Sequence, residues 1–243
     1  MRYLLIAVLA LVTLTSCKNK KEEEKIESMQ EQPAVVEADW EVLFDGSNFD
    51  QWRGYLRDTM PSEWRIEGDV MVFEPGEELA YILTKKKYTD FILSLDWKIS
   101  EGGNSGVLFG VSEVDSLPEP YYTGPEIQVL DNERHPDAKA NPKYHQAGAL
   151  YDMVQPMHDV ANPAGEWNHF DIMVDHKTNS GSVTLNGTLI VEFPVEGESW
   201  DSLVLNSKFK EWKEFGAYKT GYISLQDHGD KVSYRNIKIK TLN

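Results

Sequence analysis

The sequence has only one cysteine and no hydrophobic run long enough to cross a membrane. Cys17 stands alone, which excludes an internal disulfide bond and a thiolate metal centre. The apolar run from Leu4 to Leu14 is too short for a transmembrane helix. Because the run follows Arg2 and ends shortly before Cys17, it is typical of the apolar part of a secretory signal.

The residues Leu14-Thr15-Ser16-Cys17 resemble a bacterial lipobox, in which the cysteine thiol receives a lipid. We therefore expect residues 1–17 to be a lipoprotein signal peptide with Cys17 as the lipidation site. The protein would then be lipid-anchored in the bacterial cell envelope, in the periplasm or at the outer membrane. A cleaved signal without a lipid and an N-terminal hydrophobic anchor are the alternatives.

Aromatic residues are scarce in the segment that follows the cysteine. Residues 18–38 are rich in Lys, Glu and Gln and bury too little surface to offset the entropy of ordering, so they predict a flexible tether. One folded domain is expected over residues 39–243.

Positive charge is also in short supply. The chain has 24 Lys and Arg against 40 Asp and Glu, which gives a formal net charge of -16. Such a balance repels nucleic acid and anionic membrane surfaces. We therefore expect no nucleic-acid partner, membrane contact only through the lipid, and a neutral ligand.

Helical signals are sparse, and alternation with a period of two dominates the folded part. The best helical candidate lies in residues 203–216 and ends at Gly216. Asn186-Gly187 is a strong hairpin signal between two strand-like runs. About ten short strands predict an all-β, two-sheet antiparallel jelly-roll sandwich. The clearest strand-like runs are 70–73, 91–99, 107–111, 126–130, 170–174, 183–185, 189–193, 222–225 and 232–239.

Several familiar catalytic and cofactor motifs are missing. There is no phosphate loop, no G-x-S-x-G elbow, no H-E-x-x-H and no C-x-x-C pair. We expect no cofactor and name no metal ligands. A Ca²⁺ ion held by carbonyl and carboxylate oxygens would leave no clear mark in the sequence and stays open.

Polar residues inside three of the strand-like regions are candidates for a site. In the strand after Pro125, Glu126 and Gln128 share one face, because successive side chains alternate. This face is either a ligand groove or an ordinary exposed surface. Asp131 follows this strand and is expected to start a turn.

The segment "NPKYHQAGALYDMVQP" places His145, Tyr151 and Asp152 around a bend of small residues. A histidine suits proton transfer near neutral pH, but a single histidine in a loop is more often a packing or surface residue.

Near the C-terminus, Gln226 and His228 share a face if the strand continues, and Asp227 takes the other face. The next run changes phase at Arg235-Asn236, which predicts a β-bulge.

Seven blocks together resemble the 3-keto-disaccharide hydrolase domain family of secreted and lipoprotein sequences in bacteria. They are, in order, "WEVLFDGSNFDQWRG", "GGNSGVLFG", "GPEIQVLDN", "HQAGALYDM", "GEWNHFDIMV", "LNGTLIVEF" and "GYISLQDHGDKVSYRNIKI". The resemblance covers nearly the whole folded part and implies a concanavalin A-like jelly roll.

The resemblance implies a substrate already oxidised to a ketone at C3, an oxidised oligosaccharide or glycoside, and functional coupling to a sugar 3-dehydrogenase. The ketone acidifies the proton on C2, so a base can form an enolate and the C1 substituent can leave by elimination before water adds. We assign the proton transfers to Glu126, His145 and His228. The residues expected to bind the substrate or the enolate are Lys98, Asn104, Gln128, Asp131, Tyr151, Gln226, Asp227 and Arg235.

Two other functions compete with this one. A direct hydrolase would place two carboxylates about 5 to 9.5 Å apart across the bond, with Glu126 paired to Asp131 or Asp227. A non-catalytic carbohydrate-binding module would display aromatic side chains in a shallow groove.

Overall fold

Strand β6 (Phe91–Ile99) lies at the centre of the fold and alternates as its sequence predicts. The protein is seen in a computed structural model that describes residues 40–141 and 143–242. Leu93, Leu95 and Trp97 are almost completely buried. Asp96 and Lys98 point to the opposite face and stay partly exposed. The expected signal peptide, Cys17 and the tether of residues 18–38 lie outside the described residues.

The larger of two antiparallel sheets has eight strands. Its order is β11-β10-β9-β6-β13-β4-β3, and β1 pairs with β13 beside β4. The other strands of this sheet are β1 (Glu41–Phe44), β3 (Trp64–Glu67), β4 (Val70–Phe73), β9 (Asn168–Asp175), β10 (Ser180–Leu185), β11 (Thr188–Phe193) and β13 (Val232–Thr241).

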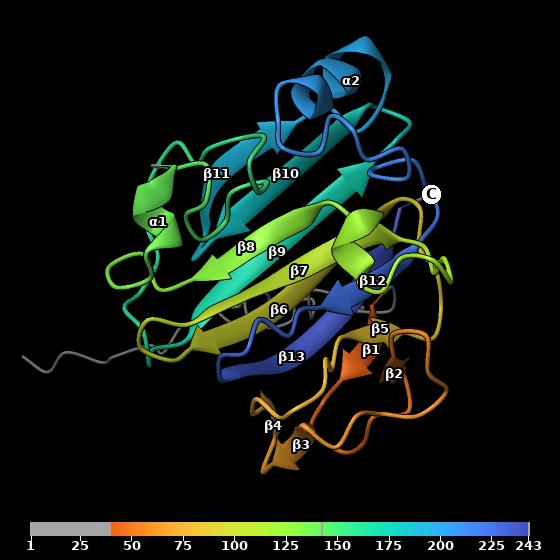
Figure 1. The fold of residues 1–243 in the computed structure, drawn as a ribbon. Coiled ribbons are helices and arrows are strands. Elements are labelled where there is room, and N and C mark those ends of the chain that lie inside the picture. Colours follow the sequence, from red (N-terminus) through yellow and green to blue (C-terminus); the bar gives the residue numbers. More distant parts are fainter. Residues whose placement is uncertain (1–39, 142, 243) are drawn as a thin grey trace, which may run out of the picture. The chain divides into compact units, whose positions relative to one another are not determined.

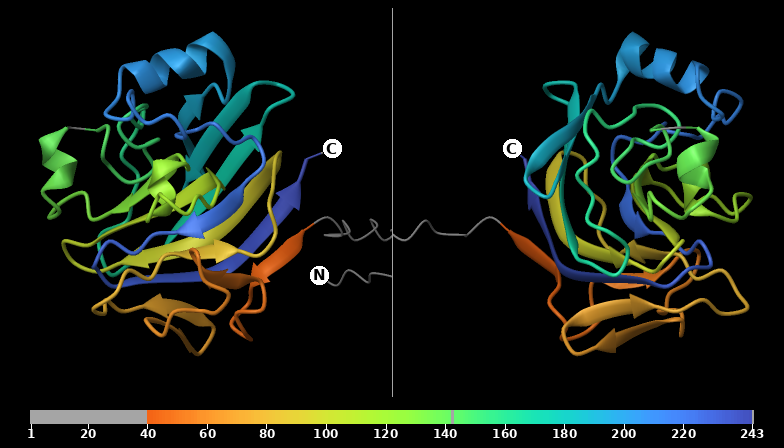
Figure 2. Two further views of the ribbon diagram at one scale, coloured as in Figure 1. Left: turned by 45° about the vertical axis from the view of Figure 1, so that its right-hand side comes forward. Right: turned by 90° about the vertical axis from the view of Figure 1, so that its left-hand side faces the viewer.

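The second sheet has five strands in the order β2-β5-β12-β7-β8. These are β2 (Trp52–Gly54), β5 (Ile82–Thr84), β7 (Asn104–Val111), β8 (Glu126–Leu130) and β12 (Tyr222–Leu225). Figure 1 shows β7, β8 and β12 in front of β6, β9 and β13, and the turned views in Figure 2 show the two sheets as facing layers. The core between the layers takes alternate residues of each sheet, for example Val107, Ile127 and Leu225 from the smaller one.

A hairpin turn and a β-bulge confirm two local predictions from the sequence. Asn186 and Gly187 join β10 to β11 with φ values of 50° and 79°. Positive φ at both positions is what a type I′ hairpin turn requires. In β13, Asn236 and Ile237 together oppose the single residue Leu95 on β6, and Asn236 has a φ of 53°. The predicted bulge is therefore present.

The predicted helix over residues 203–216 is wrong in position. Helix α2 (Gly197–Leu205) ends where that prediction begins, and residues 206–216 form turns. Asn206 and Ser207 donate side-chain hydrogen bonds back to the carbonyls of Ser202 and Val204, which closes the helix. The three-residue spacing of the aromatic residues beyond α2 imitates a helical period, although these rings pack in a cluster.

The remaining helical elements are short and lie in the loops around β8. They are η1 (Pro120–Tyr122) before β8 and α1 (Asp137–Ala140) after it. Over the described ranges, no helix combines the length and the apolar character needed to cross a membrane.

Candidate active site

The outer face of the five-stranded sheet forms the floor of a cavity of about 610 Å³. This volume lies in the usual range for sites that bind small molecules. Side chains of Asn104, Glu126, Gln128 and Gln226 line the floor. They come from β7, β8 and the end of β12, and their neighbours along each strand point into the core. Alternation thus places the polar groups predicted from β8 and β12 in one cavity.

Glu126 is the buried carboxyl group on this floor. Its register partner on β7 is Leu108, and a Cβ atom added to the nearby Gly106 would collide with the Glu126 carboxylate. Gln226 Nε2 donates a hydrogen bond of 3.2 Å to Glu126 Oε2. Burial raises the pKa of Glu126 to about 7, although the positive charge of Lys208 and the Gln226 hydrogen bond act in the opposite direction. Glu126 can therefore gain or lose a proton near neutral pH.

Two buried acceptors on the floor have no hydrogen-bond partner in the protein. They are Asn104 Oδ1 and Gln226 Oε1, on side chains whose residues are 3% and 4% exposed. A buried acceptor without a partner is costly, so these atoms are placed to accept hydrogen bonds from a ligand. Hydroxyl groups of a ligand bound on the cavity floor would satisfy them.

Asp227 and His228 lie at the edge of the cavity. Both Asp227 oxygens accept backbone hydrogen bonds, from Ala80 at 2.8 Å and from Gly229 at 2.8 Å, so this carboxylate holds the turn after β12. His228 is exposed and packs edge-on against His135. The histidine, rather than the aspartate, is free to meet a ligand.

His145 lies behind the cavity wall and is not one of its lining residues. Its ring stacks on Tyr151 with centroids 4.2 Å apart. Its Nδ1 is 2.8 Å from Asp137 Oδ1 and its Nε2 is 3.0 Å from Asp152 Oδ1. Tyr151 lines the cavity and donates its hydroxyl to Asp137. Both ring nitrogens are engaged away from the cavity, so this position does not support the expected direct proton transfer by His145.

Lys98 and Arg235 lie in the eight-stranded sheet, away from the Glu126 cavity. The Arg235 guanidinium lies 4.1 Å from the centre of the Trp167 ring and hydrogen-bonds Asp96, and the Lys98 ammonium lies 4.7 Å from the same ring. The alternation of β6 and the bulge in β13 turn both cations to the outer face of this sheet. The expectation that they hold substrate or enolate beside Glu126 is therefore corrected.

Asp131 also lies outside the cavity lining. Its oxygens accept backbone hydrogen bonds from Gly102, Glu133 and Arg134, as the turn signal predicts. A role in substrate binding is not supported by this position.

Glu119 also lines the cavity, although no sequence pattern indicates it. Glu119 accepts hydrogen bonds of 2.8 Å from the hydroxyls of Tyr81 and Tyr121, one on each oxygen. Burial and the nearby Glu119 charge raise the pKa of both tyrosines. These residues meet only in three dimensions, because Tyr81 precedes β5 and the other two belong to the loop before β8.

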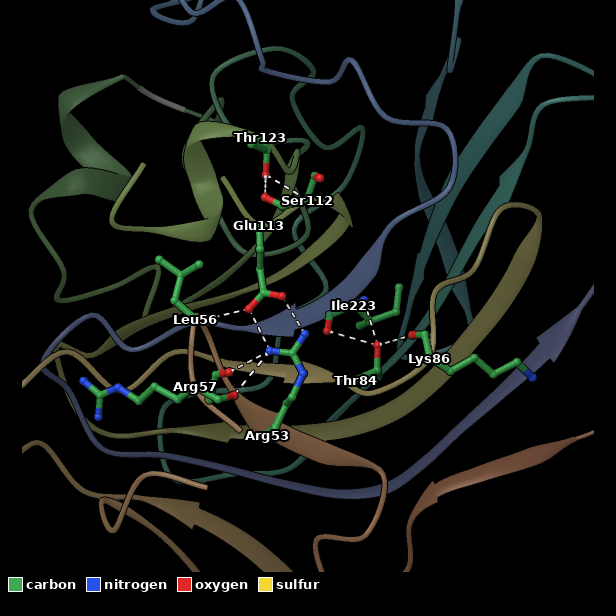
Figure 3. Close-up of polar contacts among 10 residues, drawn as sticks. Arg53, Leu56, Arg57, Thr84, Lys86, Ser112, Glu113, Thr123 and Ile223 are labelled. Carbon is green, nitrogen blue, oxygen red and sulfur yellow. Dashed lines mark hydrogen bonds and ion pairs between the residues drawn. The ribbon is translucent and has the colours of Figure 1, made fainter. Parts of the chain in front are cut away.

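Figure 3 shows how this loop is held. Arg53 forms a bidentate pair with Glu113, with N···O distances of 2.7 and 2.6 Å. At the other end of the segment, the Thr123 hydroxyl bonds the backbone N–H and carbonyl of Ser112. Tyr55 donates its hydroxyl to the Leu117 carbonyl between these ends. We call residues 112–123 the clamped loop.

An aromatic wall completes the cavity. Phe209 and Trp212, from the turns after α2, line it beside Lys208. The Trp212 ring packs against Tyr121 and Tyr122 at centroid distances of 5.9 and 4.9 Å. Rigid aromatic rings next to polar groups suit the C–H faces and hydroxyls of a sugar. In residues 40–141 and 143–242, no group of three or more His, Cys, Asp or Glu side chains is arranged to hold a metal ion.

A family model described as a 3-keto-alpha-glucoside-1,2-lyase-like domain matches residues 39–240. The chain belongs to this family. A protein named 3-keto-disaccharide hydrolase from Bacteroides thetaiotaomicron is 36% identical over 237 residues, which cover 86% of this chain and 80% of that protein. The family membership expected from the seven sequence blocks is confirmed.

Solved structures agree with the two-sheet fold. A crystal structure of a candidate glycosyl hydrolase from Parabacteroides distasonis has a TM-score of 0.78 at 30% identity, covering 91% of this chain and 97% of that one. A Bacillus subtilis protein with a galectin-like fold has a TM-score of 0.50 at 14% identity, covering 84% and 89%. The expected all-β jelly-roll sandwich is confirmed.

Proposed function

We propose that the protein is an enzyme that cleaves the glycosidic bond of 3-keto-glycosides, with 3-keto-disaccharides as one substrate group. The observation that carries this proposal is the buried Glu126 on a cavity floor that also carries two unpartnered acceptors. The family and the Bacteroides relative support the glycoside chemistry and the keto-sugar substrate.

The proposed reaction begins with removal of the C2 proton by the Glu126 carboxylate. The electron pair of the C2–H bond moves toward the C3 oxygen and forms an enolate. When the C3 carbonyl re-forms, C1 and C2 become doubly bonded, the C1–O bond breaks and the leaving oxygen takes a proton. Water then adds across the double bond to give the 3-keto sugar and the free aglycone.

The roles follow from position and pKa. A general base works best when its pKa lies near the working pH, and the raised pKa of Glu126 meets this condition. His228 at the rim is the candidate that gives the leaving oxygen its proton. Asn104 and Gln226 accept hydrogen bonds from substrate hydroxyls, and Tyr151 closes the wall beside them.

A direct two-carboxylate mechanism has less support. Asp131 is outside the cavity, and both oxygens of Asp227 are bound to backbone N–H groups. The partners expected for Glu126 in such a mechanism are therefore not available.

Incubation with 3-keto-trehalose and with trehalose in D₂O tests the proposal, with the products followed by NMR. We expect cleavage of the keto sugar alone and deuterium at C2 of the released sugar. Cleavage without deuterium at C2 would favour direct displacement. Cleavage of neither compound would favour a carbohydrate-binding module.

We also propose that Cys17 carries a lipid that anchors the protein in the bacterial cell envelope, and that a sugar 3-dehydrogenase supplies the substrate. The lipobox-like sequence and the need for a ketone at C3 support these two points. Labelling of cells with an alkyne fatty acid should mark the wild type but not a Cys17→Ala variant, and equal labelling of both would contradict the anchor.

A further inference from the structure

Lys208 supplies the one ammonium or guanidinium group among the described residues that line the Glu126 cavity. The other charged lining groups are carboxylates, including Glu119, Glu126 and Asp227. Lys208 follows α2 in the chain and precedes the buried Phe209. A single cation in an otherwise acidic cavity has a large effect on any negative charge that develops there.

The turn at Tyr151 and Asp152 fixes Lys208 at two points. The backbone N–H of Lys208 donates a 2.7 Å hydrogen bond to Asp152 Oδ2. Its ammonium lies 4.2 Å from the centre of the Tyr151 ring and 5.3 Å from that of Phe209. An ammonium held against ring faces keeps N–H donors for a ligand oxygen. Lys208 is an exposed residue, so its side chain can adjust to a substrate.

A hydrogen-bond network centred on His145 holds Tyr151 and Asp152 in position behind the cavity wall. His145 lies within hydrogen-bond distance of Asp152 on one side of its ring and of Asp137 on the other. Tyr151 stacks on His145 and donates to Asp137. His145, Asp137 and Asp152, none of which lines the cavity, therefore hold the turn that contacts the lysine.

We propose that Lys208 is a catalytic residue that donates a hydrogen bond to the C3 oxygen of the substrate and stabilises the enolate formed when Glu126 removes the C2 proton. This inference rests on the proposed function. The proton moves from C2 to Glu126, the electron pair moves onto the C3 oxygen, and the Lys208 ammonium balances the new charge without itself losing a proton. The Lys208 charge also acts on Glu126, whose pKa it lowers against the effect of burial.

The groups around Glu126 define what a change at Lys208 will do. Besides Lys208, its charged and titratable neighbours are Asp137, Tyr81, Tyr151 and Tyr234. Each of these either adds negative charge or is neutral, so Lys208 is the group that favours the ionised carboxylate by its charge. Removal of the ammonium should make Glu126 harder to ionise.

The experiment compares Lys208→Met and Lys208→Arg with wild type, and Lys210→Met is the matched control from the same exposed segment outside the cavity. The rate of C2 hydrogen–deuterium exchange in 3-keto-trehalose is followed by NMR, and kcat/KM is measured from pH 5 to 9. Circular dichroism melting checks that each variant is folded.

We expect Lys208→Met to slow C2 exchange by about 10²-fold, as for removal of one oxyanion donor, and to move the acid limb of kcat/KM to higher pH. Lys208→Arg should recover part of the exchange rate, and Lys210→Met should match wild type. An exchange rate within about threefold of wild type with an unmoved acid limb would overturn the role of Lys208. Absence of C2 exchange in the wild type would instead overturn the proposed elimination, and the lysine role with it.

Discussion

Glu126 shows at the scale of one residue how stability and chemistry conflict. Its carboxyl group is buried on the cavity floor, where ionisation costs free energy. The neighbouring Gly106 has no side chain and so leaves room for the carboxyl group. The same burial that penalises the charge gives a base with a pKa suited to neutral pH. Glutamine at this position keeps the shape of the side chain and removes the titration.

We expect kcat/KM on a 3-keto-glycoside to rise with pH through about 7, because the free enzyme must hold Glu126 ionised. The Glu126→Gln variant should lose about 10² to 10⁴-fold in kcat/KM and lose this acid limb. A pH–rate series on both proteins measures the effect. A variant that retains the wild-type rate and limb would assign the base to another residue.

The same substitution should change how stability depends on pH. The folded pKa of about 7 lies above the model-compound value of 4.5, so the native state holds a proton that the unfolded state has released between these values. The free energy of unfolding of the wild type therefore falls as pH rises from about 4.5 to 7, by about 3 kcal/mol from this group. In urea titrations at pH 4.5 and pH 8, Glu126→Gln should lose less stability than wild type over this interval, and an equal loss in both would contradict the raised pKa.

Sequence patterns predicted the cavity residues that lie in strands but not those that lie in loops. Alternation within one strand is enough to place Glu126 beside Gln128 on a single face. Glu119 and Lys208 belong to loops, and their approach to Glu126 depends on how distant turns are held. The hydrophobic periodicity of a sequence does not indicate contacts between distant loops.

At the scale of elements, the clamped loop of residues 112–123 decides where Glu119 and Tyr121 lie. The Arg53 guanidinium holds it through two hydrogen bonds to the half-buried Glu113, which also accepts the backbone N–H of Leu56. Leu56 has a φ of 52°, so the carboxylate supports a left-handed backbone position as well. Loss of the Arg53–Glu113 pair should therefore affect the cavity, although neither residue lines it.

We expect Arg53→Met to lower the free energy of unfolding by about 1 to 3 kcal/mol, since it leaves Glu113 without its partner. Amide hydrogen exchange in residues 112–123 should become faster, and KM should rise while the acid limb of the pH profile stays in place. Arg57→Met is the control, because the exposed Arg57 guanidinium contacts Glu78 and the Leu79 carbonyl rather than Glu113. Unchanged exchange in the loop would show that the clamp does not order it.

The strands were predicted correctly and the helix was not, because the spacing of aromatic residues after α2 imitates a helical period. Runs such as Val70–Phe73 and Tyr222–Leu225 match strands β4 and β12 over their full length, since a strand signal depends only on neighbouring residues. Phe209, Trp212 and Phe215 imitate a helix although they pack with one another in turns. The bulge at Asn236 was visible because it breaks an otherwise regular period.

At the scale of the whole molecule, the excess of acidic residues acts on every substrate that approaches. The net charge is -16, and the charged groups that line the cavity are carboxylates apart from Lys208, so an anionic glycoside should be repelled as it approaches. Electrostatic repulsion of this kind weakens with added salt.

We therefore expect a 3-keto-glycoside with a carboxylate on its aglycone to show a lower kcat/KM than its neutral methyl ester. The gap between the two should narrow as NaCl is raised from about 10 mM to 500 mM, because the Debye length shortens. Steady-state kinetics on the matched pair measure this. A preference for the anionic substrate would show that Lys208 outweighs the surrounding carboxylates.

In strands β7, β8 and β12, successive side chains alternate between the cavity and the core. Residues such as Gln128 and Gln226 on even positions face the cavity, and residues such as Val129 and Leu225 on odd positions face the core. Because the two sets of side chains lie on opposite sides of one backbone, mutation can alter one with little effect on the other. New sugar preferences can thus evolve on the cavity-facing positions while the core-facing positions preserve the fold, and a library restricted to Asn104, Gln128 and Gln226 would sample specificity at low risk of unfolding.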